Sequence, residues 1–162
     1  MRNLAAMSNN NKKFKSSLPS LEALETRATP AAGITASLFR GQLIINGTDR
    51  ADNITLVRTS TTISVQGVTG TTFSARLVSS ILINGGAGND TIRANTETSR
   101  FGIAINIGIT INGGDGNDSI IGGNGNDSIT GGSGNDKITG GDGNDAINGG
   151  NGNDGIDGGA GN

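Results

Sequence analysis

Aspartate recurs at a fixed spacing of nine residues along the last third of the chain, at Asp118, Asp127, Asp136, Asp145 and Asp154. Carboxylates repeated in this way supply the oxygen ligands that hard cations such as Ca²⁺ take in proteins. Softer metals prefer thiolate and imidazole ligands, and the chain contains no Cys and no His. The same absence excludes a Ser-His-Asp triad and a cysteine nucleophile. The residue types therefore indicate cation binding, with no catalytic residue expected.

The acidic charge of the chain is concentrated in the segment that carries these aspartates. The net charge is −2, but residues 113–162 contain eight Asp and one basic residue, Lys137, whereas residues 1–32 contain five basic and two acidic residues. Such an acidic segment repels nucleic acids and anionic membranes and attracts cations. We therefore predict calcium ions as the partner and no nucleic-acid partner. A cell-surface or polysaccharide partner is left open.

Each aspartate occupies the sixth position of a nine-residue unit. Five complete units begin at Gly113, Gly122, Gly131, Gly140 and Gly149, and a sixth, GGAGN, stops at Asn162. Glycine at positions one, two and four allows the positive φ angles of tight turns, and one Ile at position eight can face inward. The unit predicts six residues of turn followed by three of strand. Its interruption at Asn162 predicts a fragment of a longer array.

Stacking of these units predicts a parallel β-roll. Two units would form one coil of about eighteen residues, with coils about 4.8 Å apart. Asp118, Asp136 and Asp154 would then lie along one edge, and Asp127 and Asp145 along the other. Like charges one coil apart repel each other, so a cation between successive carboxylates would stabilise each edge. Ca²⁺ suits irregular oxygen sets better than Mg²⁺, which demands octahedral geometry.

The unit resembles GGxGxDxUx, the calcium-binding nonapeptide of RTX (haemolysin-type) proteins. The resemblance implies calcium sites between units n and n+2, namely between Asp118 and Asp136, between Asp136 and Asp154, and between Asp127 and Asp145. Proteins of this kind are generally secreted, so the resemblance also implies that this chain is located at the cell surface or in the extracellular space. The metal ligands that it implies are position-six aspartates and carbonyls of turn glycines: Asp118, Asp127, Asp136, Asp145, Asp154 and Asp90, with Gly114, Gly116, Gly123, Gly125, Gly132, Gly134, Gly141, Gly143, Gly150 and Gly152.

Two further copies of the unit lie upstream of the array. GGAGNDTIR at residues 85–93 is complete, but Asp90 has no matching unit eighteen residues later. GTDRADNIT at residues 47–55 is degraded, and we expect Arg50, in place of a glycine, to spoil its turn, so that Asp49 and Asp52 are not predicted ligands. Asp115, Asp142 and Asp157 occupy variable positions and are expected to be solvated. The segment GIAINIGITIN before Gly113 predicts an extra layer or an excursion without turn chemistry.

Residues 33–112 predict an all-β region. Short runs rich in Thr, Ile and Val are ITASLF, QLIING, NITLV, TISVQGV, TFSARLV and SILING, with turns expected at Asn46 and Asn84. Residues 1–32 predict a disordered tail with a possible short helix, SLEALETR, and no ordinary signal peptide or membrane span. The block SLEALETRATPA resembles an N-terminal tag of exported planctomycete proteins. The chain thus divides into residues 1–32, 33–112 and 113–162.

The low apolar content predicts that the array is disordered without calcium and folds when the metal binds, because five Ile cannot offset the ordering of so glycine-rich a segment. We therefore interpret the chain as an exported, non-catalytic calcium-binding β-roll with a β-rich N-terminal portion. Two alternatives stay open. The repeats are the secretion and folding appendage of a larger exported hydrolase or lyase, or the chain is part of a calcium-rigidified surface adhesin.

Overall fold

The computed structural model of the chain describes residues 33–66, 68, 71–96 and 105–161. The predicted tail, its short helix and its tag-like block lie outside the described residues, as does the start of the GIAINIGITIN segment. Every regular element in the described residues is a β-strand, and none of these residues forms a helix that could cross a membrane. The all-β fold class is therefore confirmed.

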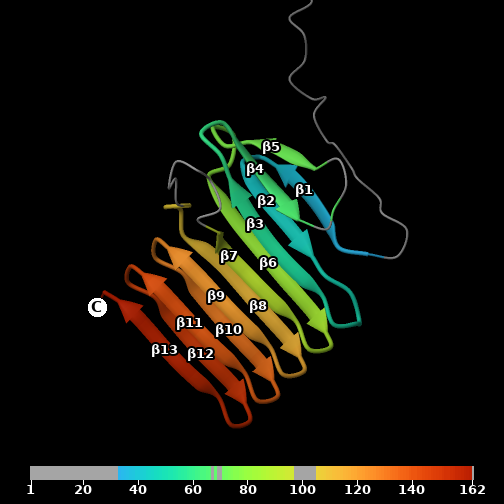
Figure 1. The fold of residues 1–162 in the computed structure, drawn as a ribbon, viewed down its shortest axis with the longest axis vertical. Coiled ribbons are helices and arrows are strands. Elements are labelled where there is room, and N and C mark those ends of the chain that lie inside the picture. Colours follow the sequence, from blue (N-terminus) through green and yellow to red (C-terminus); the bar gives the residue numbers. More distant parts are fainter. Residues whose placement is uncertain (1–32, 67, 69–70, 97–104, 162) are drawn as a thin grey trace, which may run out of the picture.

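Thirteen strands follow one another along the chain (Figure 1). The strands of the N-terminal portion are β1 (Thr35–Phe39), β2 (Gln42–Asn46), β3 (Asn53–Arg58), β4 (Thr62–Gln66), β5 (Thr72–Ser74), β6 (Ser80–Ala87) and β7 (Thr91–Thr96). Those that follow are β8 (Ile109–Asp115), β9 (Ser119–Asn124), β10 (Ser128–Ser133), β11 (Lys137–Asp142), β12 (Ala146–Asn151) and β13 (Gly155–Ala160). Each of the six Thr-, Ile- and Val-rich runs predicted upstream of the array contains a strand.

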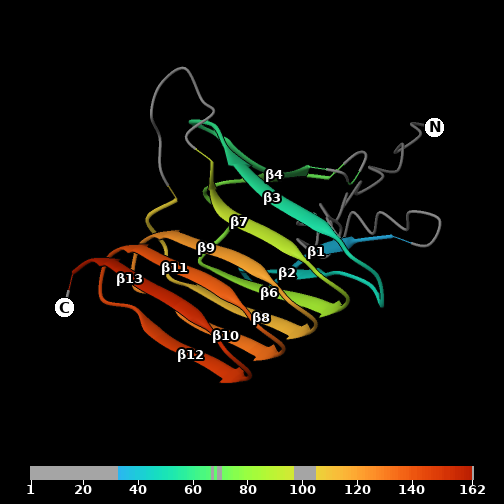
Figure 2. The same ribbon diagram turned by 60° about the horizontal axis from the view of Figure 1, so that its bottom comes forward.

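The strands form two sheets, in the orders β1-β2-β6-β8-β10-β12 and β13-β11-β9-β7-β3-β4-β5. From β6 onward, consecutive strands alternate between the sheets, and each pairs in parallel with the strand two places further along (Figure 2). This alternation matches the predicted coil. At the N-terminal end, however, β1 and β2 pair antiparallel, as do β3, β4 and β5. The sheets are therefore mixed, and no closed roll is formed by the described residues.

The strands of the array are longer than the three residues predicted. β10 and β11 each span six residues, because parallel pairing continues through the glycines that open the next unit. Gly132, for example, is in register with both Gly114 and Gly150. The turn is reduced to positions four to six. For the same reason the turn predicted at Asn84 is wrong, since β6 continues to Ala87.

The core lies between the two sheets and thins toward the C-terminal end. One isoleucine per strand is stacked in register in each sheet, as in the steps Ile111 to Ile129 and Ile120 to Ile138. The N-terminal strands add further buried side chains, among them Leu43, Leu56, Ile63, Phe73 and Ile81. Along the array, Ile138 is 1% exposed but Ile156 on β13 is 51% exposed. The position-eight isoleucines are therefore not all buried, because β13 has no following strand to cover it among the described residues.

The second half of GIAINIGITIN joins the fold, and does not form an extra layer. Ile105 is buried in the connection after β7, and Ile109 and Ile111 belong to β8. β8 pairs with β6 and β10, so it takes the place of an ordinary array strand.

Candidate metal centre

The turns that lead from the first sheet to the second line up along one edge of the molecule, at the arrowheads of β6, β8, β10 and β12 in Figure 2. The turn after β2 belongs to the same edge. Each of the five turns carries a position-six aspartate, and we call these residues the long row: Asp52, Asp90, Asp118, Asp136 and Asp154. The turns on the opposite edge carry the short row, Asp127 and Asp145. The predicted division of Asp118, Asp136 and Asp154 from Asp127 and Asp145 is what the topology produces.

Apart from Asp52, each row member has one carboxylate oxygen that accepts a backbone hydrogen bond from the coil before it. In the long row, the amide N–H of Asp118 donates to Oδ1 of Asp136 at 2.8 Å, and that of Asp136 donates to Oδ1 of Asp154 at 2.9 Å. The short row repeats this bond from Asp127 to Asp145 at 2.9 Å. Oδ1 of Asp127 accepts from Ile109, at the start of β8, also at 2.9 Å. These bonds hold each side chain in one orientation.

The second oxygen, Oδ2, is buried and has no hydrogen-bond partner at five positions: Asp90, Asp118, Asp127, Asp136 and Asp145. Burial of a carboxylate oxygen without a partner is strongly unfavourable, because the charge loses its hydration and gains nothing in return. Four of the five residues are only 2% exposed, Asp145 being the partly buried one. A cation bound here would supply the partner that these oxygens lack.

The acidity of the row carboxyls reflects this environment. Burial raises the pKa of Asp90 to about 6; the hydrogen bond from Asp52 lowers it, and the charges of Asp118 and Asp52 raise it. Burial likewise raises the pKa of Asp127 to about 6, opposed by the bond from Ile109 and reinforced by Asp145. The pKa of Asp118 is raised for the same leading reason. Without a cation the ionised forms of Asp90, Asp118 and Asp127 are therefore destabilised.

Each of these free oxygens lies close to the first glycine of its own unit, and so does a backbone carbonyl of the next coil. A Cβ atom added to Gly113, the first residue of its unit, would meet both Oδ2 of Asp118 and the carbonyl oxygen of Gly131. The same pair of contacts, carboxylate and next-coil glycine carbonyl, recurs at four further glycines: Gly85, Gly122, Gly131 and Gly140. The five spaces are those whose aspartate has an unpartnered Oδ2. A side chain larger than that of glycine would crowd both oxygens, and hard oxygen atoms of these two kinds suit Ca²⁺.

The carbonyls that approach the same glycine as Oδ2 belong to position one of the unit, which sequence reasoning did not select. Glycines at positions two and four, such as Gly114 and Gly116, have φ of 115° and 126° and pack tightly against the preceding coil. Their part as ligands, with that of the other eight position-two and position-four glycines, stays a prediction. The position-one carbonyls are those of Gly113, Gly131, Gly140, Gly149 and Gly158. The glycine at position one was the signal in the sequence. Because this position does not require a positive φ, its recurrence as glycine within the units needs another reason, such as the nearby oxygen atoms.

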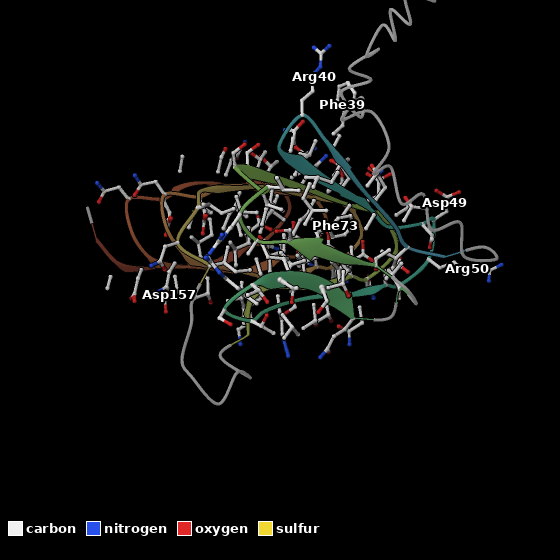
Figure 3. The ribbon with its side chains drawn as sticks, turned by 90° about the horizontal axis from the view of Figure 1, so that it is seen from above. Phe39, Arg40, Asp49, Arg50, Phe73 and Asp157 are labelled. Atoms are coloured by element: carbon white, nitrogen blue, oxygen red, sulfur yellow. The ribbon has the colours of Figure 1, made fainter. Side chains whose placement is uncertain are left out.

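Asp90 joins the long row in spite of its irregular spacing. Its amide N–H donates to Oδ1 of Asp118 at 2.8 Å across 28 residues of sequence. Asp52 joins too, because its amide donates to Oδ1 of Asp90 at 2.8 Å. The turn of the degraded copy at residues 47–55 therefore keeps its place in the long row, contrary to expectation. Asp49 and Arg50 are exposed and extend away from the strands (Figure 3).

The hydrogen bonds between successive row aspartates form a ladder, which we call the aspartate ladder. Asparagine at position five forms a second ladder of hydrogen bonds, on the outside of the same turns. The amide N–H of Asn135 donates to Oδ1 of Asn117, and that of Asn153 donates to Oδ1 of Asn135, at 2.6 and 2.8 Å. The direction is opposite to that of the aspartate ladder, since here the later coil donates. From the turn of Asp90 onward in the long row, and between the two short-row turns, each turn is thus fixed to the next by two oppositely directed side-chain bonds.

The remaining ligands of a cation would come from the backbone or from water. Within the described ranges, no group of three or more His, Cys, Asp or Glu side chains is close enough to hold a metal. A cavity at the last short-row turn is lined by Asp145 and by glycines only: Gly143, Gly158, Gly159 and Gly161. Asp115, Asp142 and Asp157 are exposed, as expected for solvated charges, and Figure 3 shows Asp157 at the periphery.

Three stretches of the chain, residues 82–96, 110–138 and 130–162, match the family model described as RTX calcium-binding nonapeptide repeat (4 copies). The matched residues include Asp90 and all the units from Gly113 onward, but not the degraded copy at residues 47–55. No curated protein and no solved structure matches the chain.

Proposed function

From the premise that the chain carries RTX calcium-binding nonapeptide repeats, whose cofactor is Ca²⁺, we propose that it is an exported, non-catalytic calcium-binding protein. Calcium completes the repeat array as a parallel β-roll. The observation that carries the proposal is the set of five buried Oδ2 atoms without a partner, each close to a glycine that a carbonyl of the next coil also approaches. When bound, Ca²⁺ supplies the positive charge and the coordination that these oxygens lack.

The proposed sites lie in both rows. Three pair a long-row carboxylate with the next coil, at Asp90, Asp118 and Asp136, and two belong to the short row, at Asp127 and Asp145. Oδ1 of Asp154 accepts the hydrogen bond from Asp136, but among the described residues no next-coil carbonyl lies beside the glycine that Oδ2 of Asp154 approaches. The expected stoichiometry is therefore five calcium ions per chain for residues 33–161.

Coupling between calcium and folding is expected to differ along the chain. The N-terminal strands bury large side chains on both sheets, including Leu43, Leu56 and Phe73, whereas an array strand buries one isoleucine. Hydrophobic burial stabilises the fold in proportion to apolar area. We propose that residues 33–96 supply a template that folds without metal, and that the array from residue 113 depends on calcium. The proposed export to a calcium-rich extracellular space would then trigger folding of the array.

A calcium titration followed by far-ultraviolet circular dichroism tests this function, with magnesium as the control cation. The expected result is a cooperative gain of β signal with calcium that a chelator reverses, while magnesium at equal concentration has little effect. Isothermal calorimetry on the same sample counts the ions. Absence of both heat and spectral change would contradict the proposal.

A matched pair of variants locates the ions. Asp136→Asn removes the negative charge of a carboxylate whose Oδ2 has no partner. Asp142→Asn removes the charge of an exposed aspartate six residues away. The first variant is expected to bind one calcium ion fewer, and the second to bind as many as the unchanged protein. Equal losses in both variants would show that calcium responds to net charge and not to the rows.

A further inference from the structure

The first turn of the long row differs from the others in the partner of its carboxylate. Oδ2 of Asp52 accepts a hydrogen bond from the amide N–H of Thr48 at 2.6 Å and another from its hydroxyl, Oγ1, at 2.9 Å. Asp90, Asp118 and Asp136 have no partner at the same atom. Asp52 is therefore the long-row member whose Oδ2 is satisfied by the protein itself.

The hydroxyl bond follows from one residue type. Thr48 occupies position two of its unit, where the following long-row units have Gly86, Gly114 and Gly132. Glycine has no hydroxyl, so those turns cannot provide the second donor. The hydroxyl oxygen of Thr48 also accepts from the amide N–H of Arg50 at 3.2 Å, which fixes it in place. The hydroxyl proton then goes to Asp52 Oδ2, since the alternative acceptor, the carbonyl of Arg50, is 3.5 Å away.

The first turn otherwise presents the same kinds of oxygen. A Cβ atom on Gly47 would meet the carbonyl oxygen of Gly85 and would lie 2.9 Å from Oδ2 of Asp52. This pair corresponds to Oδ2 of Asp90 with the carbonyl of Gly113 in the next turn. The Arg50 side chain is exposed and points outward from the strands (Figure 3). The turn therefore keeps the oxygen pair and differs in having protein donors to the carboxylate.

We infer that Thr48 takes the place of the cation in the first turn, so that Asp52 continues the ladder but binds no calcium. The inference rests on the proposed function, because it assigns which row members bind the metal. A carboxylate that already holds two short hydrogen bonds gains less from a cation, which would have to displace the hydroxyl donor. Thr48 is thus a specificity-determining residue. The calcium-binding turns stack on a metal-independent first turn that belongs to the N-terminal portion.

The test counts calcium ions bound by the full chain, by equilibrium dialysis at saturating calcium and by native mass spectrometry. Asp52→Asn is expected to leave the count at that of the unchanged protein. Thr48→Gly, which gives the first turn the glycine of the other units, is expected to bind one ion more. The double variant Thr48→Gly with Asp52→Asn is expected to return to the original count, and Thr48→Ser, which keeps the hydroxyl, is expected to match the unchanged protein.

Two outcomes would overturn the inference: loss of one ion in Asp52→Asn, or no gain in Thr48→Gly when its circular dichroism with calcium equals that of the unchanged protein. If Thr48→Gly fails to fold, the comparison of Asp52→Asn with Asp118→Asn decides by itself. Asp118→Asn is expected to bind one ion fewer. An unchanged count in Asp118→Asn would contradict the proposed calcium sites, and not the part assigned to Thr48.

Discussion

The amide N–H of Asp90 donates to Oδ1 of Asp118 at 2.8 Å, although 28 residues separate them. Within the array the same bond joins residues that are 18 apart. The ladder therefore ignores the inserted residues and connects an isolated repeat copy to the array. The ladder continues into the degraded copy through the bond from Asp52 to Asp90, which are 38 residues apart in the sequence. The row of carboxylates thus extends beyond the array that the sequence pattern marks out.

Asp90→Asn is expected to reduce the number of bound calcium ions from five to four. The substitution keeps an oxygen that can accept from the amide of Asp52, but removes the charge of a buried, unpartnered Oδ2. Isothermal calorimetry measures the count. Asp115→Asn, at an exposed position, serves as the control. A count unchanged by Asp90→Asn would mean that the copy at residues 85–93 holds no calcium.

The metal-free fold is expected to be more stable at pH 4.5 than at pH 7.5. Folding raises the pKa of Asp90, which lies in the portion expected to fold without metal, from 3.8 to about 6, so the folded chain holds this proton more tightly than the unfolded chain. Stability therefore falls as pH rises from about 4 to about 6, and stays low above it. Urea unfolding in the presence of a chelator measures it.

Saturating calcium should reverse this pH dependence, because the metal binds the ionised carboxylates. Unfolding midpoints that rise with pH in chelator would contradict the assignment of desolvated carboxyls in the rows.

Gly113→Ala is expected to remove the site at Asp118 and to destabilise the calcium-bound protein by about 1–3 kcal/mol. Its Cβ would meet Oδ2 of Asp118 and the carbonyl oxygen of Gly131. Gly158→Ala is a control at the same position of the unit, because a Cβ there meets nothing within 4 Å. Thermal unfolding with calcium measures both. Similar losses in the two variants would show that helical or extended propensity, and not the oxygen pair, sets the cost.

Removal of calcium is expected to release the array while the N-terminal strands persist. In chelator, the amides of Lys137 and Ala146, which bond to the carbonyls of Asp118 and Asp127, should exchange rapidly with solvent. Amides in the antiparallel pairing of Leu56 with Val65 should stay protected, because the larger core covers them. Hydrogen exchange with and without calcium measures this. Equal protection of both groups in chelator would show that the array does not depend on the metal.

The nine-residue period was enough to predict the parallel pairing, the two edges and the isoleucine rows, because each of these depends only on equivalent residues meeting two units later. The six strands upstream followed from runs of β-branched residues. The antiparallel pairings of β1 with β2 and of β3, β4 and β5 did not follow, since no period marks them. The exposure of Ile156 also depends on the strand beyond, which composition does not reveal.

The candidate site was predicted less completely than the fold. Asp118, Asp127, Asp136 and Asp145 have the buried oxygens expected of ligands, and Asp154 joins their ladder. Asp52 was set aside because Arg50 replaces a glycine, yet the ladder needs only the backbone of that turn. The part of Thr48 could not be read from the motif, because it depends on a hydroxyl reaching a side chain four residues ahead.

The segments inserted between repeat units lie on only one of the two edges described above. Two segments lengthen the spacing between repeat units. The first contains β4 and β5 and connects β3 to β6, and the second connects β7 to β8. Each begins at the end of a strand of the second sheet and ends at the start of a strand of the first sheet. That is the short-row edge. The long row opposite them keeps each hydrogen-bonded step. The scaffold therefore has one edge open to grafting of loops or small domains and one that such additions leave intact.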